Sequence, residues 1–127
     1  MMVPRTKSAN AIGYPEIIDA LVRLTPDWIV CGELSIANAQ PVYATMGKGH
    51  PVITTVHAGS PAEAVAAFAN NMSIAGADSA LSGDALYESI ASQVGAIVQL
   101  ERRDGKRRVV EIAFPSREIA KKRNSDS

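Results

Sequence analysis

The sequence predicts an α/β fold, and three observations support this class. Two short apolar runs rich in β-forming residues, at 28–31 and 52–56, predict buried strands with polar residues directly after them. Segments with apolar residues at helical spacing flank both runs. Nearer the C-terminus an Asp-Gly pair separates two further apolar segments, which is typical of a hairpin. The sequence therefore predicts a central sheet flanked by helices, with a C-terminal β-hairpin.

The first helix is predicted over 14–24, where apolar residues recur at helical spacing and Pro15 suits the first turn. This helix leads into the strand at 28–31. A second helix should begin near Gln40, because Pro41 has no backbone donor and is tolerated only in a first turn. Glycine and proline residues then end this helix before the second strand.

The third helix has the clearest start signal. Residues 60–63, Ser-Pro-Ala-Glu, form a capping box with proline at the first helical position. Small residues over 73–83 predict a flexible link, and a further helix is marked by Leu86, Ile90 and Val94. Strands at 96–100 and 108–114 then form the hairpin around residues 102–106.

Three regions follow from this pattern. Residues 1–13 show no periodicity and predict a flexible N-terminal arm, and 14–115 form the predicted core. The tail over 116–127 is charged and has Ile119 as its large apolar residue, so we expect a solvated helix end or a disordered segment. Its basic residues are candidates for an acidic partner or a lipid surface, although a solvated tail is the ordinary expectation.

Composition excludes several classes of protein. The 127 residues suffice for one domain, and 13 basic and 13 acidic side chains cancel, so no overall positive field indicates nucleic-acid binding. No apolar run approaches the ~20 residues that cross a bilayer, and the N-terminal segment lacks a signal-peptide core, which predicts a cytoplasmic protein. The single cysteine, Cys31, lies in a predicted strand, where packing is the expected role rather than catalysis.

Side chains that can carry chemistry follow each predicted strand at once. Glu33 follows the first strand and His57 the second. Functional groups gather at the carboxyl ends of strands in open α/β sheets, so we expect this carboxylate and imidazole to border one crevice. The structural alternatives are a solvated acid at Glu33, a turn cap at Asp27 and a histidine that only packs. A zinc-dependent hydrolase using Glu33, His50 and His57 is a weaker hypothesis, because their spacing matches no recognised ligand pattern.

Two ordered motifs in this stretch carry a resemblance to a known family. Residues 23–27, Arg-Leu-Thr-Pro-Asp, and 29–34, Ile-Val-Cys-Gly-Glu-Leu, resemble the Walker B segment of the secretion or traffic ATPases. These are the motors of type II and type IV secretion, conjugation and pilus assembly. At a matching separation, Gly49-His50 and the Thr-Thr-Val-His-Ala run over 54–58 resemble the histidine box of that family. The similarity continues to about Pro115.

The resemblance implies a partial RecA-like P-loop NTPase core. In the intact family it implies ATP and Mg²⁺ as cofactors and a hexameric ring, homo- or hetero-oligomeric, that works with inner-membrane secretion or pilus components. Glu33 would activate the attacking water and His57 would sense phosphate, as the catalytic residues. The implied nucleotide-binding residues, with no metal ligand and no direct nucleic-acid contact, are Asp27, Gly32, His50 and Thr55.

The chain also departs from the family pattern. Neither Gly47-Lys48 nor Gly105-Lys106 is followed by Ser or Thr, so the Walker A motif that holds nucleotide phosphates is absent from this sequence. Three charged residues of the family are replaced by uncharged ones. Ser35 stands where the family usually has an arginine, Asn38 where it has a glutamate, and Ala67 where it has an arginine. We therefore expect a fragment or degenerate member that is not a competent ATPase alone; the alternative is a non-catalytic assembly or regulatory subunit.

Overall fold

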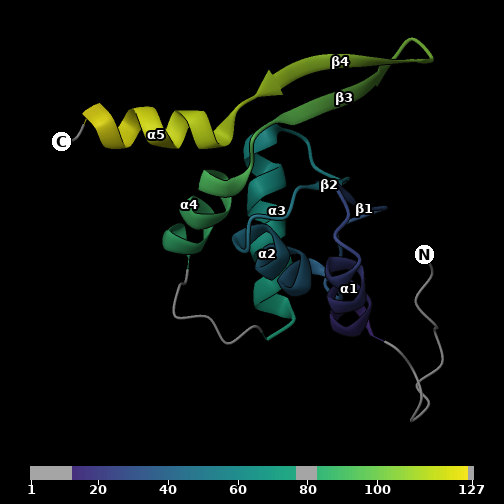
Figure 1. Cartoon of the computed structure of the whole chain (residues 1–127). Helices are drawn as coiled ribbons and strands as arrows, with labels where there is room; N and C mark the ends of the chain where they lie inside the picture. Colours follow the sequence, from purple (N-terminus) through teal and green to yellow (C-terminus); the bar gives the residue numbers. More distant parts are fainter. Residues whose placement is uncertain (1–12, 77–82, 126–127) are drawn as a thin grey trace. The chain divides into compact units, whose positions relative to one another are not determined.

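The computed structural model describes residues 13–76 and 83–125, which belong to two compact units, Met1–Thr55 and Val56–Ser127 (Figure 1). The first unit contains α1 (Tyr14–Arg23), β1 (Ile29–Cys31), α2 (Ala39–Gly47) and β2 (Val52–Thr54). The second contains α3 (Pro61–Ile74), α4 (Asp84–Gln93), β3 (Ile97–Arg103), β4 (Lys106–Ala113) and α5 (Pro115–Ser125). The predicted N-terminal arm lies outside the described residues except for Gly13, as does most of the predicted link.

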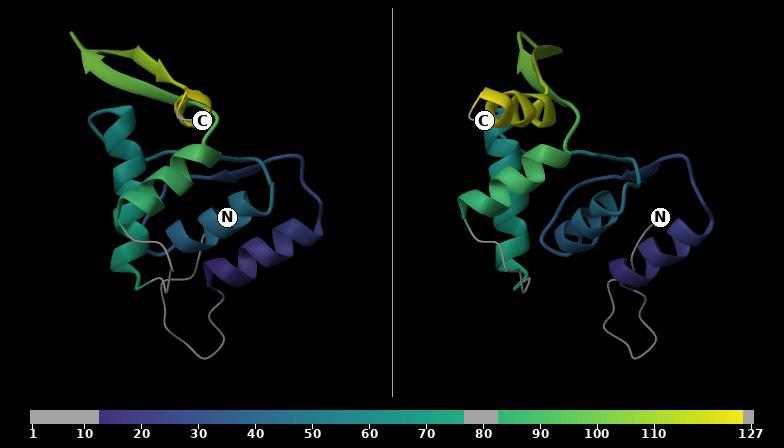
Figure 2. Two further views of the ribbon diagram at one scale, coloured as in Figure 1. Left: turned by 90° about the vertical axis from the view of Figure 1, so that its left-hand side faces the viewer. Right: turned by 60° about the vertical axis from the view of Figure 1, so that its left-hand side comes forward.

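In the first unit, β1 and β2 pair in parallel, with Ile29 opposite Val52 and Cys31 opposite Thr54. Both views in Figure 2 show α1 and α2 side by side on one side of this pair. Ile29 is 8% exposed, but Val30 is 74% exposed because alternate residues of a strand point to opposite faces. Within the described part of the first unit, helices lie on one face of the strands, and the prediction of buried strands is wrong for the other face.

Helix α2 begins close to Gln40, as the position of Pro41 predicts. The helix begins at Ala39, which places Pro41 in the first turn, where its missing N–H removes no helical hydrogen bond. The carbonyl oxygen of Pro41 accepts a hydrogen bond from the Thr45 hydroxyl at 2.8 Å. Val42 and Thr45 are both buried and form the inner face of the helix.

In the second unit, the start of α3 is fixed by its capping box, as predicted. The Ser60 hydroxyl accepts from the Glu63 N–H at 3.2 Å, and the Glu63 carboxylate accepts from the Gly59 N–H at 2.9 Å. Helix α3 packs against α4, and the core of the unit comprises the buried side chains Ala64, Val65, Phe68, Met72, Leu86, Ile90 and Ala91. Ser73 and Ile74, which were predicted to belong to the link, instead complete α3.

The hairpin forms around Asp104 and Gly105, as the Asp-Gly pair predicts. Both residues have positive φ, 52° and 75°, as a two-residue hairpin turn of type I′ requires. The strands are longer than predicted, because residues 102–103 and 106–107 also pair. One β-bulge interrupts the ladder between Gln99 and Leu100.

The charged tail is helical over α5, so of the two alternatives the solvated helix end is correct for these residues. The helix stays attached to α4: the Ser116 N–H donates to the Val94 carbonyl at 3.0 Å. At its start the Arg117 guanidinium lies 4.7 Å from the centre of the Phe114 ring. Among the described residues, no helix has the length and apolar character needed to span a bilayer.

Replacing Ser60 with Ala should lower the free energy of unfolding of the second unit by about 1 kcal/mol, because the Glu63 N–H loses its acceptor. Urea unfolding followed by circular dichroism measures this change. Ser73→Ala is the matched control: its hydroxyl bonds to the Ala69 carbonyl within the same helix, and alanine has the higher helix propensity. Equal losses in the two variants would contradict the capping role.

Candidate functional site

The carboxyl ends of β1 and β2 are tied together directly beyond the strands. The Thr55 hydroxyl donates to the carbonyl oxygen of Gly32 at 2.6 Å, and the Leu34 N–H donates to the Thr55 carbonyl at 2.8 Å. Leu34 is 5% exposed, so this connection is also anchored by an apolar side chain. Gly32 and Thr55, two of the predicted nucleotide-binding residues, are thus brought into contact with each other.

Asn38 holds the far end of the same loop. Its side-chain oxygen accepts from the Ser35 N–H at 2.8 Å, and its side-chain amide donates to the Glu33 carbonyl at 2.8 Å. The amide also lies 3.3 Å from the Cys31 sulfur. Asn38 is only 1% exposed, and a buried amide with these partners stabilises one loop conformation.

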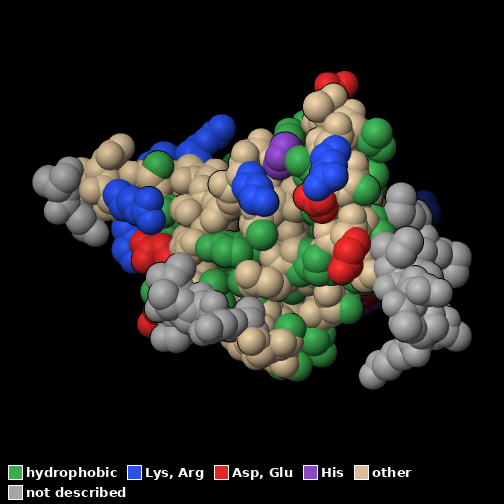
Figure 3. Space-filling view, turned by 60° about the horizontal axis from the view of Figure 1, so that its bottom comes forward, with side chains coloured by type: hydrophobic (Ala, Val, Ile, Leu, Met, Phe, Trp, Pro, Cys, Tyr) green, Lys and Arg blue, Asp and Glu red, His purple; other side chains and the backbone are tan. Residues whose placement is uncertain are grey.

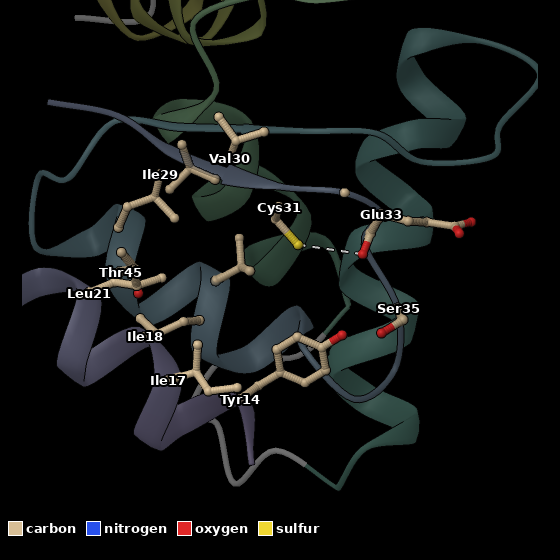
Figure 4. A pocket seen from close by; sticks show the side chains of 13 residues that line it. Tyr14, Ile17, Ile18, Leu21, Ile29, Val30, Cys31, Glu33, Ser35 and Thr45 are labelled. Atoms are coloured by element: carbon tan, nitrogen blue, oxygen red, sulfur yellow. Dashed lines mark hydrogen bonds between the residues drawn. The ribbon is translucent and has the colours of Figure 1, made fainter. Parts of the chain in front are cut away.

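Glu33 therefore projects from a loop that is fixed at both ends. Its side chain is exposed, while its backbone carbonyl accepts from Asn38 and, at 3.5 Å, from the Cys31 thiol. Figure 4 shows the Glu33 carboxylate pointing away from the apolar side chains of Ile17 and Ile18. The carboxylate is accessible to water, and the backbone from which it extends is fixed. A group that orients water needs both.

Two predicted site residues lie at the opposite edge of the sheet. Asp27 precedes β1 and His50 precedes β2, whereas Glu33 follows β1. A strand rises about 3.3 Å per residue, so the three residues of β1 alone separate the two edges by roughly 10 Å. Asp27 and His50 thus lie at the opposite edge of the sheet from Gly32 and Thr55, and the nucleotide contacts of all four residues stay predictions.

His57 belongs to the second unit, two residues beyond Thr55 in the sequence. It is exposed and lies in the segment that leads into α3. The backbone beside it is anchored within that unit, because the Gln99 side-chain amide on β3 donates to the Ala58 carbonyl at 2.9 Å. The shared crevice of Glu33 and His57 stays a prediction.

A cavity of about 320 Å³ lies between α1 and the inner face of the sheet (Figure 4). Its walls are mostly aliphatic, with the Tyr14 ring at one side; Glu33 and Ser35 line it from the loop. Aliphatic walls do not solvate the charge of a phosphate. The cavity therefore does not fit a nucleotide.

The carboxyl edge fits only part of what a nucleotide site requires. It offers a carboxylate that can handle water, but the two Lys and Arg residues in the described part of the first unit, Arg23 and Lys48, both precede the strands. Arg23 also pairs with Asp19 at 3.1 Å. Phosphate groups need cations or a cradle of N–H groups, so this edge does not hold a triphosphate by itself. Within residues 13–76 and 83–125, no three His, Cys, Asp or Glu side chains cluster to hold a metal ion.

Sequence reasoning missed the role of Asn38. It noted this residue only as an uncharged replacement of a glutamate, whereas the structure uses the side chain to organise the Glu33 loop. No local signal indicated this role: Asn38 is the N-cap residue of α2, but its side chain makes no capping hydrogen bond to that helix. Its partners at Glu33 and Ser35 follow from the loop conformation, which the sequence pattern did not specify.

Comparisons with a family profile and with individual proteins indicate the same family. The profile of the type II/IV secretion system protein family matches residues 2–125. A putative conjugal transfer protein of Mycobacterium tuberculosis strain H37Rv is 32% identical over 117 residues, which cover 88% of this chain and 32% of the relative. The type IV secretion system protein VirB11 of Bartonella quintana is 34% identical over 109 residues, which cover 82% of this chain and 30% of the relative. The chain thus spans about a third of the length of these relatives.

Replacing Asn38 with Ala should destabilise the first unit by about 2 kcal/mol, because one N–H and one carbonyl of the loop lose their partners. Amide hydrogen exchange should show the effect most strongly at Ser35. Asn70→Ala, at an exposed position of α3, is the control and should leave the Ser35 amide unchanged. Unaltered exchange at Ser35 in the Asn38 variant would show that Asn38 does not hold the loop.

Proposed function

Because this chain belongs to the type II/IV secretion system protein family, we propose that it supplies the Glu33-bearing edge of a secretion or conjugation motor ATPase. One observation carries this proposal: the loop that presents Glu33 is fixed at one end by Thr55 and at the other by Asn38. Fixing both ends holds the backbone of Glu33 in position without a bound ligand, and preorganisation of a catalytic loop lowers the barrier of the chemical step.

In this proposal the chain's own groups handle water and sense an anion. The Glu33 carboxylate accepts a hydrogen bond, and then a proton, from an attacking water molecule. The His57 imidazole donates a hydrogen bond to an anionic oxygen, next to the start of α3. Bound ATP and Mg²⁺ supply the phosphoryl group and neutralise its charge in phosphoryl-transfer enzymes.

In this proposal the phosphate-binding groups lie outside the 127 residues of this sequence. Two observations support such a division of the site: the sequence has no Walker A motif, and within residues 13–55 no Lys or Arg lies at the carboxyl edge of the sheet. Gly32 and Thr55 at the carboxyl edge, and Asp27 and His50 at the other edge, are the proposed contacts to nucleotide on this chain. The assembled motor would be a hexameric ring on the cytoplasmic side of the inner membrane, in contact with secretion or pilus components.

A second candidate is a non-catalytic assembly or regulatory subunit of such a complex. The observation that favours it concerns Asn38, which stands where the family usually has a glutamate. This side chain is buried and hydrogen-bonds to the loop. Under this candidate the same loop would only stabilise the fold. The two candidates differ in whether the Glu33 carboxylate affects the rate of hydrolysis.

The test mixes this chain with a polypeptide corresponding to the Walker A-bearing part of the Mycobacterium tuberculosis relative and measures phosphate release. Glu33→Gln should lower kcat about a hundredfold, because the amide cannot accept a proton from water, with a smaller effect on KM. Glu16→Gln, an exposed position in the first turn of α1, is the matched control and should leave the rate unchanged.

Two outcomes would contradict the catalytic proposal. The first is complex formation without any stimulation of phosphate release. The second is equal rates for the Glu33 and Glu16 variants. Either result, together with complex formation by light scattering, would favour the assembly or regulatory subunit.

A further inference from the structure

One peptide group beside His57 is held at both of its polar ends. This group joins Ala58 to Gly59. Its carbonyl oxygen accepts a hydrogen bond from the Gln99 side-chain amide at 2.9 Å, and its N–H donates to the Glu63 carboxylate at 2.9 Å. A peptide group is planar, so contacts at its two ends fix the orientation of the whole group. The backbone directly after His57 is therefore held between β3 and the first turn of α3.

Strand β3 directs Gln99 toward this segment. Gln99 and Ile97 are half-buried, whereas Val98 between them is exposed, so Gln99 lies on the face of the strand that the rest of the unit partly covers. The β-bulge falls directly after Gln99, and bulges change the direction of nearby side chains. Gln99 and Ala58 are 41 positions apart in the sequence, so their hydrogen bond is a tertiary contact and not part of a local turn.

Gly59 lets the Glu63 carboxylate come close to the same peptide group. A Cβ atom at position 59 would lie 2.6 Å from Oε2 of Glu63, which is too short for a non-bonded contact. A side chain there would push the carboxylate away from the N–H. The bond to this carboxylate is charge-assisted, and such bonds are stronger than those between neutral groups. The absence of a side chain at position 59 thus helps to hold the peptide group.

His57 is the one side chain of residues 56–63 that can carry a positive charge, and Glu63 is the one carboxylate. His57 is exposed, whereas Val56 and Ala58 on either side of it are half-buried. The Lys and Arg side chains of α5 gather close to the C-terminal residues drawn in grey in Figure 3. Within this segment, contact with an anionic oxygen therefore depends on where one imidazole lies, and that depends on the backbone beside it.

We propose that Gln99 is a positioning residue for His57. Its hydrogen bond to the Ala58 carbonyl holds the segment that carries the imidazole in a fixed orientation relative to the start of α3. Without this bond the peptide group would keep the Glu63 contact at its N–H and could rotate about it. The link to ATP hydrolysis rests on the proposed function, in which His57 meets an anionic oxygen; the effect on the backbone does not.

The first test measures the segment in the full chain without nucleotide. Gln99→Met keeps the length of the side chain but removes its donor. The Gly59 amide should exchange with solvent about fivefold faster in this variant, because its peptide group loses one of two contacts. The backbone order parameter of His57 from nitrogen-15 relaxation should fall from about 0.85 toward 0.6. Gln99→Lys, which keeps an N–H donor of comparable reach, should retain both original values.

Gln93→Met is the matched control. It makes the same chemical change on α4, where the Gln93 amide donates to the Ser89 carbonyl of its own helix at 3.3 Å. It should leave the Gly59 amide and the His57 order parameter unchanged. Equal effects in the two methionine variants would indicate a general loosening of the unit and would overturn the proposal. So would unchanged Gly59 exchange in Gln99→Met, or a lysine variant as mobile as the methionine variant.

The second test uses the mixture with the Walker A-bearing polypeptide. Gln99→Met should lower kcat about tenfold, with a smaller effect on KM. Since Gln99 acts through His57, it should cause no further loss in a chain that already carries His57→Ala. Losses that multiply would refute the positioning role. An unmutated mixture that releases no phosphate would instead contradict the proposed function, and the exchange and relaxation results would then decide the role of Gln99.

Discussion

The parallel pairing of β1 and β2 is the constraint on which the first unit depends. Parallel strands end at the same edge, so Gly32 and Thr55 meet there, and the hydroxyl of one bonds to the carbonyl of the other. An antiparallel pair would separate these residues by the length of the strands. The chemistry that we propose for Glu33 follows from this pairing, because the loop that carries it begins at the joined edge.

Asn38 completes the arrangement from the other side of the loop. A primary amide can donate and accept at once, so this one side chain satisfies the Ser35 N–H and the Glu33 carbonyl together. Burial makes both bonds matter, since water cannot replace them when the amide is removed. A carboxylate at the same position would provide no donor for the Glu33 carbonyl, so the replacement changes how the loop is held as well as its charge.

Features set by neighbouring residues could be predicted from the sequence, and features set by distant partners could not. The capping box at Ser60, the first-turn position of Pro41 and the Asp-Gly turn depend on local backbone geometry, and all three were confirmed. The exposed face of β1 was not predictable, because its apolar residues do not reveal which face lacks a covering layer. The helix at 115–125 was left open for the same reason: its attachment to Val94 is a contact between segments far apart in the sequence.

The central claim is that Thr55 and Asn38 hold one loop together. A double-mutant cycle with Thr55→Val and Asn38→Ala tests it most directly. The quantity measured is the free energy of opening at the Leu34 amide, obtained from hydrogen exchange. The account predicts that the double variant loses less than the two single losses combined, by more than about 0.5 kcal/mol, because either loss already loosens the shared loop. Strict additivity would show that the two contacts act separately and that the Glu33 loop is not a single fixed element.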